Sequence, residues 1–205
     1  IDDPDAGDSL TLAASTKPTW LSFNANTGVL SGTPTNNDVG SHNVVLTATD
    51  SSGAVTSQSF TITVNNTNDA PTVANTITDQ STAEDASFIY QVPSNTFADV
   101  DSGTTLTYTA TLANGSSLPS WLSFNTSTRT FSGTPTNSEV GTIAVKVTAS
   151  DGTATVSDTF NITVTNTNDA PTVANAIPNQ SAGQGSSFSY QIPNNTFFDI
   201  DGGDS

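Results

Sequence analysis

The sequence has no cysteine and no methionine, and it contains one histidine and three lysine or arginine residues among 205. Without cysteine there are no disulfides, no thiolate chemistry and no sulfur ligands for a soft metal. Nineteen acidic residues give a formal net charge of −16. Because nucleic acid and anionic membranes bind through lysine and arginine, both are excluded as partners. Calcium, cationic surfaces and uncharged glycans remain.

Long apolar runs are also missing, so we expect no membrane insertion. The first residues, Ile1-Asp2-Asp3, do not form a signal peptide, which predicts an internal part of a longer protein. No nucleophile recurs beside a base, and no glycine-rich phosphate loop precedes a helix. We therefore expect the protein not to be an enzyme.

What the sequence does contain is a repeated phrase. Asn66-Thr67-Asn68-Asp69-Ala70-Pro71 recurs letter for letter at residues 166–171. Each copy follows an alternating apolar run, at residues 60–64 and 160–164, and ends in a proline that cannot extend a strand ladder. A period of 100 residues is the size of one small domain. The phrase is thus predicted to be a linker between two modules.

The repeat divides the chain into three parts. Residues 70–169 form the complete module, residues 1–69 a module that lacks its first strands, and residues 170–205 the opening strands of a third. Residues 199–205 also align with residues 3–9. This alignment predicts two periods of a longer tandem array, with unpaired strand edges at both ends.

Alternation of apolar and polar residues predicts the fold class. Ile143, Val145, Val147 and Ala149 share one face of a predicted strand. Turn signals recur every ~8 to 12 residues, the complete module has about seven predicted strands, and no helix is predicted. The prediction is an all-β protein of tandem Greek-key β-sandwich modules.

Acidic residues recur in phase with the linkers. Asp99 and Asp101 flank one residue, Asp151 follows a long predicted strand, and these side chains can converge with Asn68 and Asp69 at one end of a sandwich. Two carboxylates ~5 Å apart repel by roughly 3 kcal/mol at an effective dielectric of ~20. Since every donor is a hard oxygen, Ca²⁺ is the cation that fits.

These motifs resemble bacterial cadherin-like repeats, in particular the dystroglycan-type cadherin-like and immunoglobulin-like modules of large surface proteins. Residues 66–71 resemble the cadherin interdomain linker, Asp99 with Asp101 the Asp-x-Asp motif, and residues 149–152 the Ala-x-Asp-Gly motif. Glu84 resembles the glutamate at the base of a cadherin domain. Leu118 to Phe124, followed by Gly133-Thr134-Pro135, matches the immunoglobulin-like signature.

The resemblance implies ligand sets for calcium at each linker. The first set is Asp38, Asn66, Asn68, Asp69, Asp99, Asp101 and Asp151. The second set is Glu84, Glu139, Asn166, Asn168, Asp169, Asp199 and Asp201. A third set, above a linker that precedes the chain, is Asp3, Asp5 and Asp50. The linkers lack the second asparagine before proline, and Gln184 replaces the basal glutamate in the third copy, so we expect one or two ions at each linker.

The function that follows is a calcium-rigidified structural repeat of a bacterial cell-surface or secreted protein, an extracellular spacer of the adhesin type whose partners are the neighbouring modules. Two alternatives remain open. One is a carbohydrate-binding accessory module of a secreted polysaccharide-degrading enzyme. The other is an extracellular filament, in which residues 170–205 of one molecule complete residues 1–69 of the next head to tail.

Overall fold

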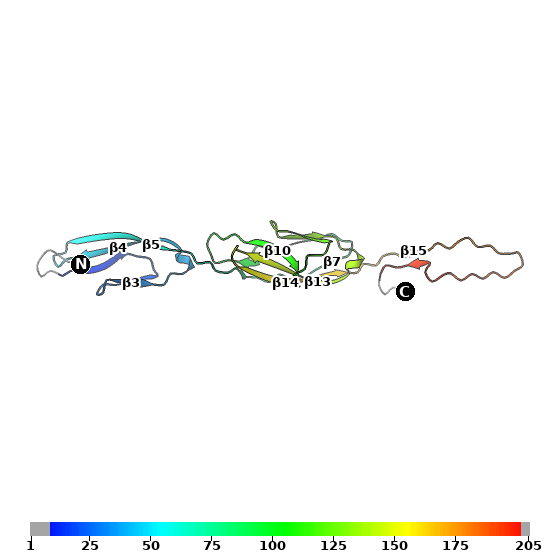
Figure 1. Cartoon of the computed structure of the whole chain (residues 1–205), viewed down its shortest axis with the longest axis horizontal. Coiled ribbons are helices and arrows are strands. Elements are labelled where there is room, and N and C mark those ends of the chain that lie inside the picture. The colour runs from blue at the N-terminus through cyan, green and yellow to red at the C-terminus, as the bar shows by residue number, and fades with distance from the viewer. Residues whose placement is uncertain (1–8, 202–205) are drawn as a thin grey trace. The chain divides into compact units, whose positions relative to one another are not determined.

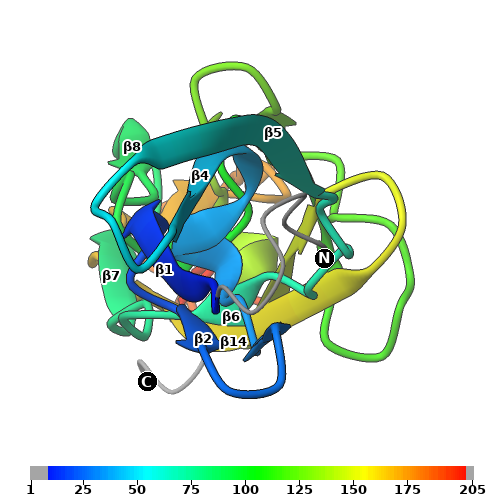
Figure 2. The same cartoon turned by 90° about the vertical axis from the view of Figure 1, so that its left-hand side faces the viewer.

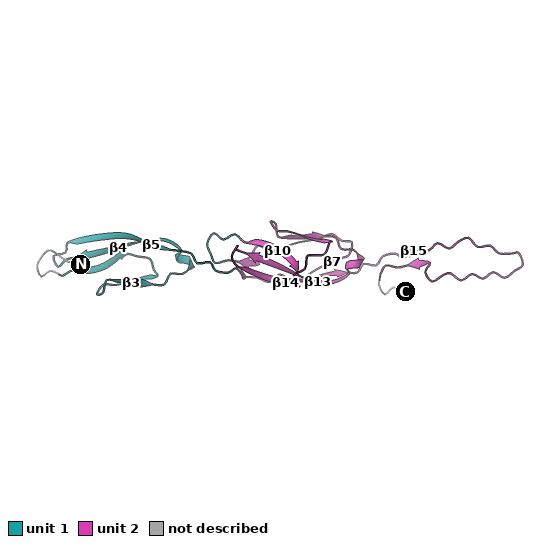
Figure 3. Cartoon of the chain, in the orientation of Figure 1, with its two compact units in different colours: residues 1–70, 99–105 teal, residues 71–98, 106–205 magenta. Residues whose placement is uncertain are grey.

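The computed structural model describes residues 9–201. It divides into two compact units, one from residues 1–70 with 99–105 and one from residues 71–98 with 106–205 (Figure 3). Strands make up nearly all of the regular structure in both units (Figure 1). The all-β prediction is therefore confirmed, and the units are described separately below.

The first unit contains a three-stranded antiparallel sheet in the order β1-β4-β5 (Figure 2). Its strands are β1 (Thr11–Thr16), β4 (Gly40–Thr49) and β5 (Val55–Val64). A separate hairpin joins β2 (Leu21–Asn24) to β3 (Val29–Gly32), and Gly28 in its turn adopts φ +70°, a conformation that favours glycine. A 3-10 turn, η1 (Asn36–Asp38), leads into β4.

The second unit builds a four-stranded sheet in the order β10-β13-β14-β7. Its strands are β10 (Thr107–Leu112), β13 (Gly141–Ser150), β14 (Thr155–Thr165) and β7 (Gln80–Ala83). Strand β7 pairs parallel with β14, and the other pairs are antiparallel. The 3-10 turn η2 (Asn137–Glu139) leads into β13.

A three-stranded sheet, β11-β12-β8, faces this four-stranded sheet. It consists of β11 (Leu122–Asn125), β12 (Thr130–Gly133) and β8 (Phe88–Gln91). A short pair joins β6 (Thr72–Val73) to β9 (Phe97–Ala98). Residues 70–169 thus carry β6 to β14, nine strands rather than about seven, because this two-residue pair adds to the predicted ladders.

The core of the complete module lies between these sheets. Val145, Val147 and Ala149, predicted to share one face, are fully buried, and the partly buried Ile143 packs against the same cluster. Phe131 of β12 meets Phe160 of β14 edge to face, with ring centroids 5.7 Å apart. Contacts between aromatic rings of the two sheets close the sandwich.

The third copy of the repeat, residues 170–201 of the described chain, is paired only at its base. Strand β15 (Thr172–Val173) pairs with β16 (Phe197–Phe198), and no strand forms within residues 174–196 between them. In Figure 1 this stretch runs out from β15 and returns. Residues 188–191 repeat β8 except that Ser189 replaces Ile89, but the described residues provide no sheet edge beside them.

Candidate metal-binding sites

The two copies of the linker phrase adopt the same local conformation. Residues 65–70 follow β5 and residues 166–170 follow β14, and neither stretch forms a strand. In the first copy Asn68 Nδ2 donates to Asp69 O at 3.0 Å, and in the second Asn168 Nδ2 donates to Asp169 O at 3.0 Å. The asparagine thereby fixes the backbone carbonyl that follows it.

The Asp-x-Asp motif of each copy lies directly against the linker that precedes it. Asp101 Oδ2 accepts a hydrogen bond from Asp69 N at 2.8 Å, and Asp201 Oδ2 accepts one from Asp169 N at 2.5 Å. These two carboxylates are only 5 % and 4 % exposed. The first acid of each motif accepts from the second: Asp101 N lies 2.8 Å from Asp99 Oδ1, and Asp201 N lies 2.9 Å from the equivalent Asp199 oxygen.

Glu84, the predicted basal glutamate, is 3 % exposed and follows β7 directly. Its Oε1 accepts a hydrogen bond from Thr167 N at 2.6 Å. Glu84 and Asp201 therefore hold two alternate N–H groups of the second linker, those of Thr167 and Asp169. No counterpart of Glu84 occurs in the described part of the first unit.

The acids of the 3-10 turns, Asp38 and Glu139, act as caps. Asp38 Oδ2 accepts from Thr35 N and Thr35 Oγ1, both at 2.8 Å, and Glu139 Oε2 accepts from Thr136 N at 2.9 Å and from its hydroxyl at 2.7 Å. These bonds lower the pKa of both carboxyls, the backbone bond contributing most for Asp38 and the hydroxyl bond most for Glu139. Calcium ligation by either acid stays a prediction.

Sequence reasoning missed Asn36 and Asn137, which lie in the same turns. Asn36 Nδ2 donates to Asp69 Oδ2 at 2.6 Å, whereas Asn137 Nδ2 donates to Asp201 Oδ1 at 3.0 Å. Both asparagines end the Ser-Gly-Thr-Pro-Thr-Asn phrase that is copied between the modules. That copying was the available signal.

Three carboxylate oxygens in these groups are buried without a hydrogen-bond partner: Asp99 Oδ2, Asp101 Oδ1 and Glu84 Oε2. A buried polar group that lacks a partner costs about 1–3 kcal/mol, and more when it is charged. A hard cation with 6 to 8 oxygen ligands would satisfy such oxygens, and the linkers and motifs offer carboxylate, amide and carbonyl oxygens as further ligands. The residues present therefore fit calcium.

Partial burial raises the pKa of Asp169, and the negative charges of Asp201, Asp85, Glu84 and Asp199 raise it further. The second linker thus lies in a field of like charge. A bound cation would reverse this effect by favouring the ionised carboxylate.

The remaining predicted ligands lie in turns or outside the described chain. Asp50 Oδ1 accepts from Ser52 N, Ser52 Oγ and Ala54 N, which lowers its pKa, mainly through the Ser52 hydroxyl. Asp151 Oδ1 accepts hydrogen bonds from Thr153 N and Ala154 N, both at 2.6 Å. Asp151 belongs to the second unit, whereas Asp99 and Asp101 belong to the first. Asp3 and Asp5 lie outside the described residues.

Carboxylates alone do not enclose an ion in this geometry. Within residues 9–201 no three Asp, Glu or His side chains converge closely enough to hold a metal. A calcium site must therefore take amide and backbone carbonyl oxygens as ligands as well. Exposed Asn66 and Asn166, which open the two linkers, supply oxygens of this kind.

For the described residues, no helix has the length and apolar character needed to cross a membrane. An open cleft of about 340 Å³ lies in the first unit, and Leu12, Phe23 and Leu46 are among the residues that line it. Its lining also includes polar residues such as Thr47 and Gln58 but no charged residue, so it differs in character from the carboxylate groups.

The family model described as Putative Ig domain matches residues 1–65 and 70–165. No curated protein matches the chain. Among solved structures, human mucin-like protocadherin EC1-2 is similar, with a TM-score of 0.58 and 17 % identity over 79 % of this chain and 86 % of that chain. Mouse cadherin-23 EC22-24 gives a TM-score of 0.53 and 17 % identity over 77 % of this chain and 53 % of that chain.

An endo-fucoidan hydrolase, MfFcnA4 from glycoside hydrolase family 107, is 27 % identical, with a TM-score of 0.39 over 78 % of this chain and 24 % of that chain. The chain therefore spans about a quarter of the length of this hydrolase. The two cadherin structures share the β-sandwich architecture of the modules.

Proposed function

The chain belongs to the Putative Ig domain family, and we propose that it is a calcium-rigidified structural repeat of an extracellular protein, such as a bacterial surface or secreted protein of the adhesin type. The observation that carries the proposal is the set of buried carboxylate oxygens without partners, Asp99 Oδ2, Asp101 Oδ1 and Glu84 Oε2, beside the repeated linkers. The cadherin-like fold and the in-phase recurrence of the acids support the same conclusion.

The chain's own residues define how the linkers would be held. In the second unit Glu84 and Asp201 accept hydrogen bonds from the N–H groups of Thr167 and Asp169. The linker is thus bound both by the module before it and by the segment after it. In the first unit Asp101 accepts Asp69 N, and Asn36 reaches the Asp69 carboxylate. Asp101 and Glu84 each accept a linker N–H through one carboxylate oxygen, and their other oxygen has no hydrogen-bond partner and could bind a cation. In Asp201 the other oxygen accepts a hydrogen bond from Asn137.

When bound, calcium would neutralise the clustered carboxylates and cross-link oxygens that come from distant parts of the sequence. A linker held only by hydrogen bonds leaves its modules free to pivot, because small interdomain contacts allow relative motion by default. Cross-linking removes that freedom and stabilises the folded chain by mass action. The proposed outcome is a stiff spacer.

The test is a calcium titration of chelator-treated protein. We expect the melting temperature to rise, with about 2.7 kcal/mol of stabilisation at a calcium concentration a hundredfold above the dissociation constant. Small-angle X-ray scattering should show an ensemble with a smaller spread of molecular dimensions as the linkers stiffen. Magnesium, which demands a tighter octahedral site, should act more weakly, and no response to millimolar calcium would reject the proposal.

A further inference from the structure

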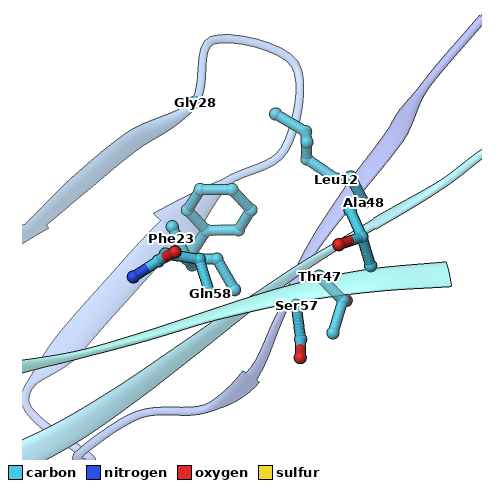
Figure 4. A pocket seen from close by; sticks show the side chains of 9 residues that line it. Leu12, Phe23, Gly28, Thr47, Ala48, Ser57 and Gln58 are labelled. Atoms are coloured by element: carbon cyan, nitrogen blue, oxygen red, sulfur yellow. The ribbon is translucent and has the colours of Figure 1, made fainter. Parts of the chain in front are cut away.

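The cleft in the first unit is an incomplete sandwich core. Leu12 of β1 and Phe23 of β2 turn toward the same opening, and Gln58 of β5 borders it (Figure 4). Leu46 of β4 also lines this opening. The hairpin β2–β3 has no third strand beside it, and β5 is an edge strand of its sheet in the described part of this unit. An opening of about 340 Å³ beside two unpaired strand edges thus leaves the side chains of Leu12, Phe23 and Leu46 without a covering strand in the described part of this unit.

The second unit shows what covers the same face when it is complete. Residues 72–98 supply β7 beside β14 and β8 beside β12. They also supply Ile77, Phe88, Val92 and Phe97, each at most 6 % exposed, to the cluster that contains Val147. Val147 is the counterpart of Leu46 in the repeat, so the segment at 72–98 occupies the space that is open in the first unit.

The chain carries a second copy of this covering segment, residues 172–198, with its apolar side chains exposed. Phe188 is 56 % exposed where Phe88 is 5 % exposed, and Ile192 is 51 % exposed where Val92 is fully buried. Ile177, Tyr190 and Phe197 repeat Ile77, Tyr90 and Phe97 and are exposed as well. Every core-facing position of the covering segment has remained apolar.

The outward-facing position of β8 is polar in the third copy. Ile89 lies on the outer face of β8 and is 73 % exposed, and its counterpart in the third copy is Ser189. Ile177, Phe188 and Ile192 thus stand at positions that the second unit buries, and Ser189 stands at a position that faces solvent. Phe198 is the exception, since it is 57 % exposed and its counterpart Ala98 is exposed too. This pattern is that of a strand that packs against a core.

Charge also matches between the segment and the cleft. Residues 172–198 contain no charged side chain, whereas the copy at 72–98 contains Asp79, Glu84 and Asp85. The cleft lining is uncharged, and Gln58 stands where the second unit has Asp158, whose carboxylate accepts Ile77 N at 2.6 Å. In a chain of net charge −16, a neutral segment and a neutral cleft can meet without the repulsion expected between most of its surfaces.

We propose that the cleft and the free edges of β3 and β5 bind residues 172–198 of a second copy of this chain. The register follows from the second unit, where Ile162 pairs with Gln80 and Ser132 pairs with Ile89. Residues 180–182 of one copy then pair parallel with residues 62–64 of the other, and Ser189 lies opposite Ser31. Because donor and acceptor are different surfaces, the contact is heterologous and repeats from copy to copy.

The register is tested by disulfide formation, which the absence of native cysteine makes specific. Two single variants of the full chain, Ser31→Cys and Ser189→Cys, are mixed and oxidised. Opposed residues of antiparallel strands are close enough for a disulfide, so a cross-linked heterodimer is expected. Ser181→Cys is the matched control: it lies in the same segment, is expected opposite Thr63, and should cross-link to Ser31→Cys at least tenfold less.

Sedimentation velocity over a hundredfold range of concentration tests the assembly itself. The chain should shift from monomer to dimers and longer species, and the double variant Tyr190→Asp/Ile192→Asp should remain monomeric. These two side chains are exposed in the single copy, so the variant leaves the fold of the monomer unchanged. Ser189→Asp, on the outward face, is the matched control and should assemble like the parent.

A monomer at every concentration would overturn the proposal, as would equal cross-linking by Ser181→Cys and Ser189→Cys. A double variant, Ser31→Cys/Ser189→Cys, that cross-links only within one chain would show that the segment covers its own chain's cleft instead, which also contradicts docking between copies. All arms are run with chelator and with calcium. The contact needs no ion, so its outcome is independent of the calcium proposal.

Discussion

The long hairpins β4–β5 and β13–β14 have equivalent pairing but unequal burial. Val44 pairs with Phe60 in the first, and Val145 pairs with Phe160 in the second. Phe160 is 2 % exposed and Ile162 is fully buried, whereas Phe60 and Ile62 are only half-buried. Local sequence thus suffices for strand pairing in this repeat, but burial of the paired strands depends on a covering segment about 80 residues away in the chain.

Truncation of the two equivalent phenylalanines should give the largest difference in stability loss between the two modules. Phe160→Ala removes a fully packed ring and should destabilise its module by about 3–5 kcal/mol. Phe60→Ala should cost less in dilute protein, because that ring is only partly buried and its truncation removes fewer packing contacts. Urea unfolding followed by Trp121 fluorescence in Trp20→Phe protein, and by Trp20 fluorescence in Trp121→Phe protein, reads each module separately. Equal losses would contradict the comparison.

Calcium should stabilise both modules through different residues. At a hundredfold excess over the dissociation constant the gain is about 2.7 kcal/mol for a single site. Asp101→Asn should remove the gain read by Trp20 and leave most of the gain read by Trp121, since Asp101 belongs to the first ligand group. Glu84→Gln should do the reverse. If each variant abolished both gains, the two groups would not be independent sites.

Glycine substitution in the short hairpins should instead affect the two modules equally. A Cβ on Gly32 would lie 2.1 Å from Trp20 O, and one on Gly133 would lie 1.9 Å from Trp121 O. Either alanine variant forces the backbone apart, at a cost of about 1–3 kcal/mol. Because this contact lies within one hairpin, the covering segment should make no difference. A markedly smaller loss at Gly32, measured by the same two fluorescence signals, would show that the open hairpin is already loose.

Acidification should produce the smallest difference in stability between the two modules, and the aspartates that cause it should act with opposite signs. The lowered pKa of Glu139 makes the second module lose stability as pH falls below 4.5, so the acid response of Asp169 is read in Glu139→Gln protein. The raised pKa of Asp169 means that its protonated form is favoured in the folded state, so without calcium the second module of this variant gains stability as pH falls toward 3.8. The lowered pKa values of Asp38 and Asp50 contribute stability above 3.8 that the first module loses as pH falls further. Melting in chelator between pH 7 and pH 3 measures both. A second module of Glu139→Gln protein that only loses stability on acidification would contradict this assignment.

Much of the fold could be predicted because it depends on local sequence. Alternation of apolar and polar residues located the strand β13 and the buried side chains of Val145 and Val147. The stretch at residues 188–191 could not be predicted in the same way. It repeats β8 with Ser189 in place of Ile89 but forms no strand, because strand formation needs an edge to pair with.

The candidate ligand groups likewise contain some contacts that the sequence predicted and others that depend on the three-dimensional fold. Asp69 and Asp101 were expected to converge, and the structure places them together through a direct hydrogen bond. The copied phrase that ends at Asn36 marked this residue as part of the repeat, but its contact with Asp69 depends on the three-dimensional path of η1. For Asp38, the spacing from Thr35 also fits a capping box, a local use of the acid that family resemblance does not reveal.

The most direct test of the calcium account is an anomalous difference map from crystals of the chain grown with calcium chloride. The account predicts a peak about 2.3–2.6 Å from Asp101 Oδ1 in the first group and another at that distance from Glu84 Oε2 in the second. Ordered density without an anomalous peak at either oxygen, with water molecules donating hydrogen bonds to them instead, would contradict it.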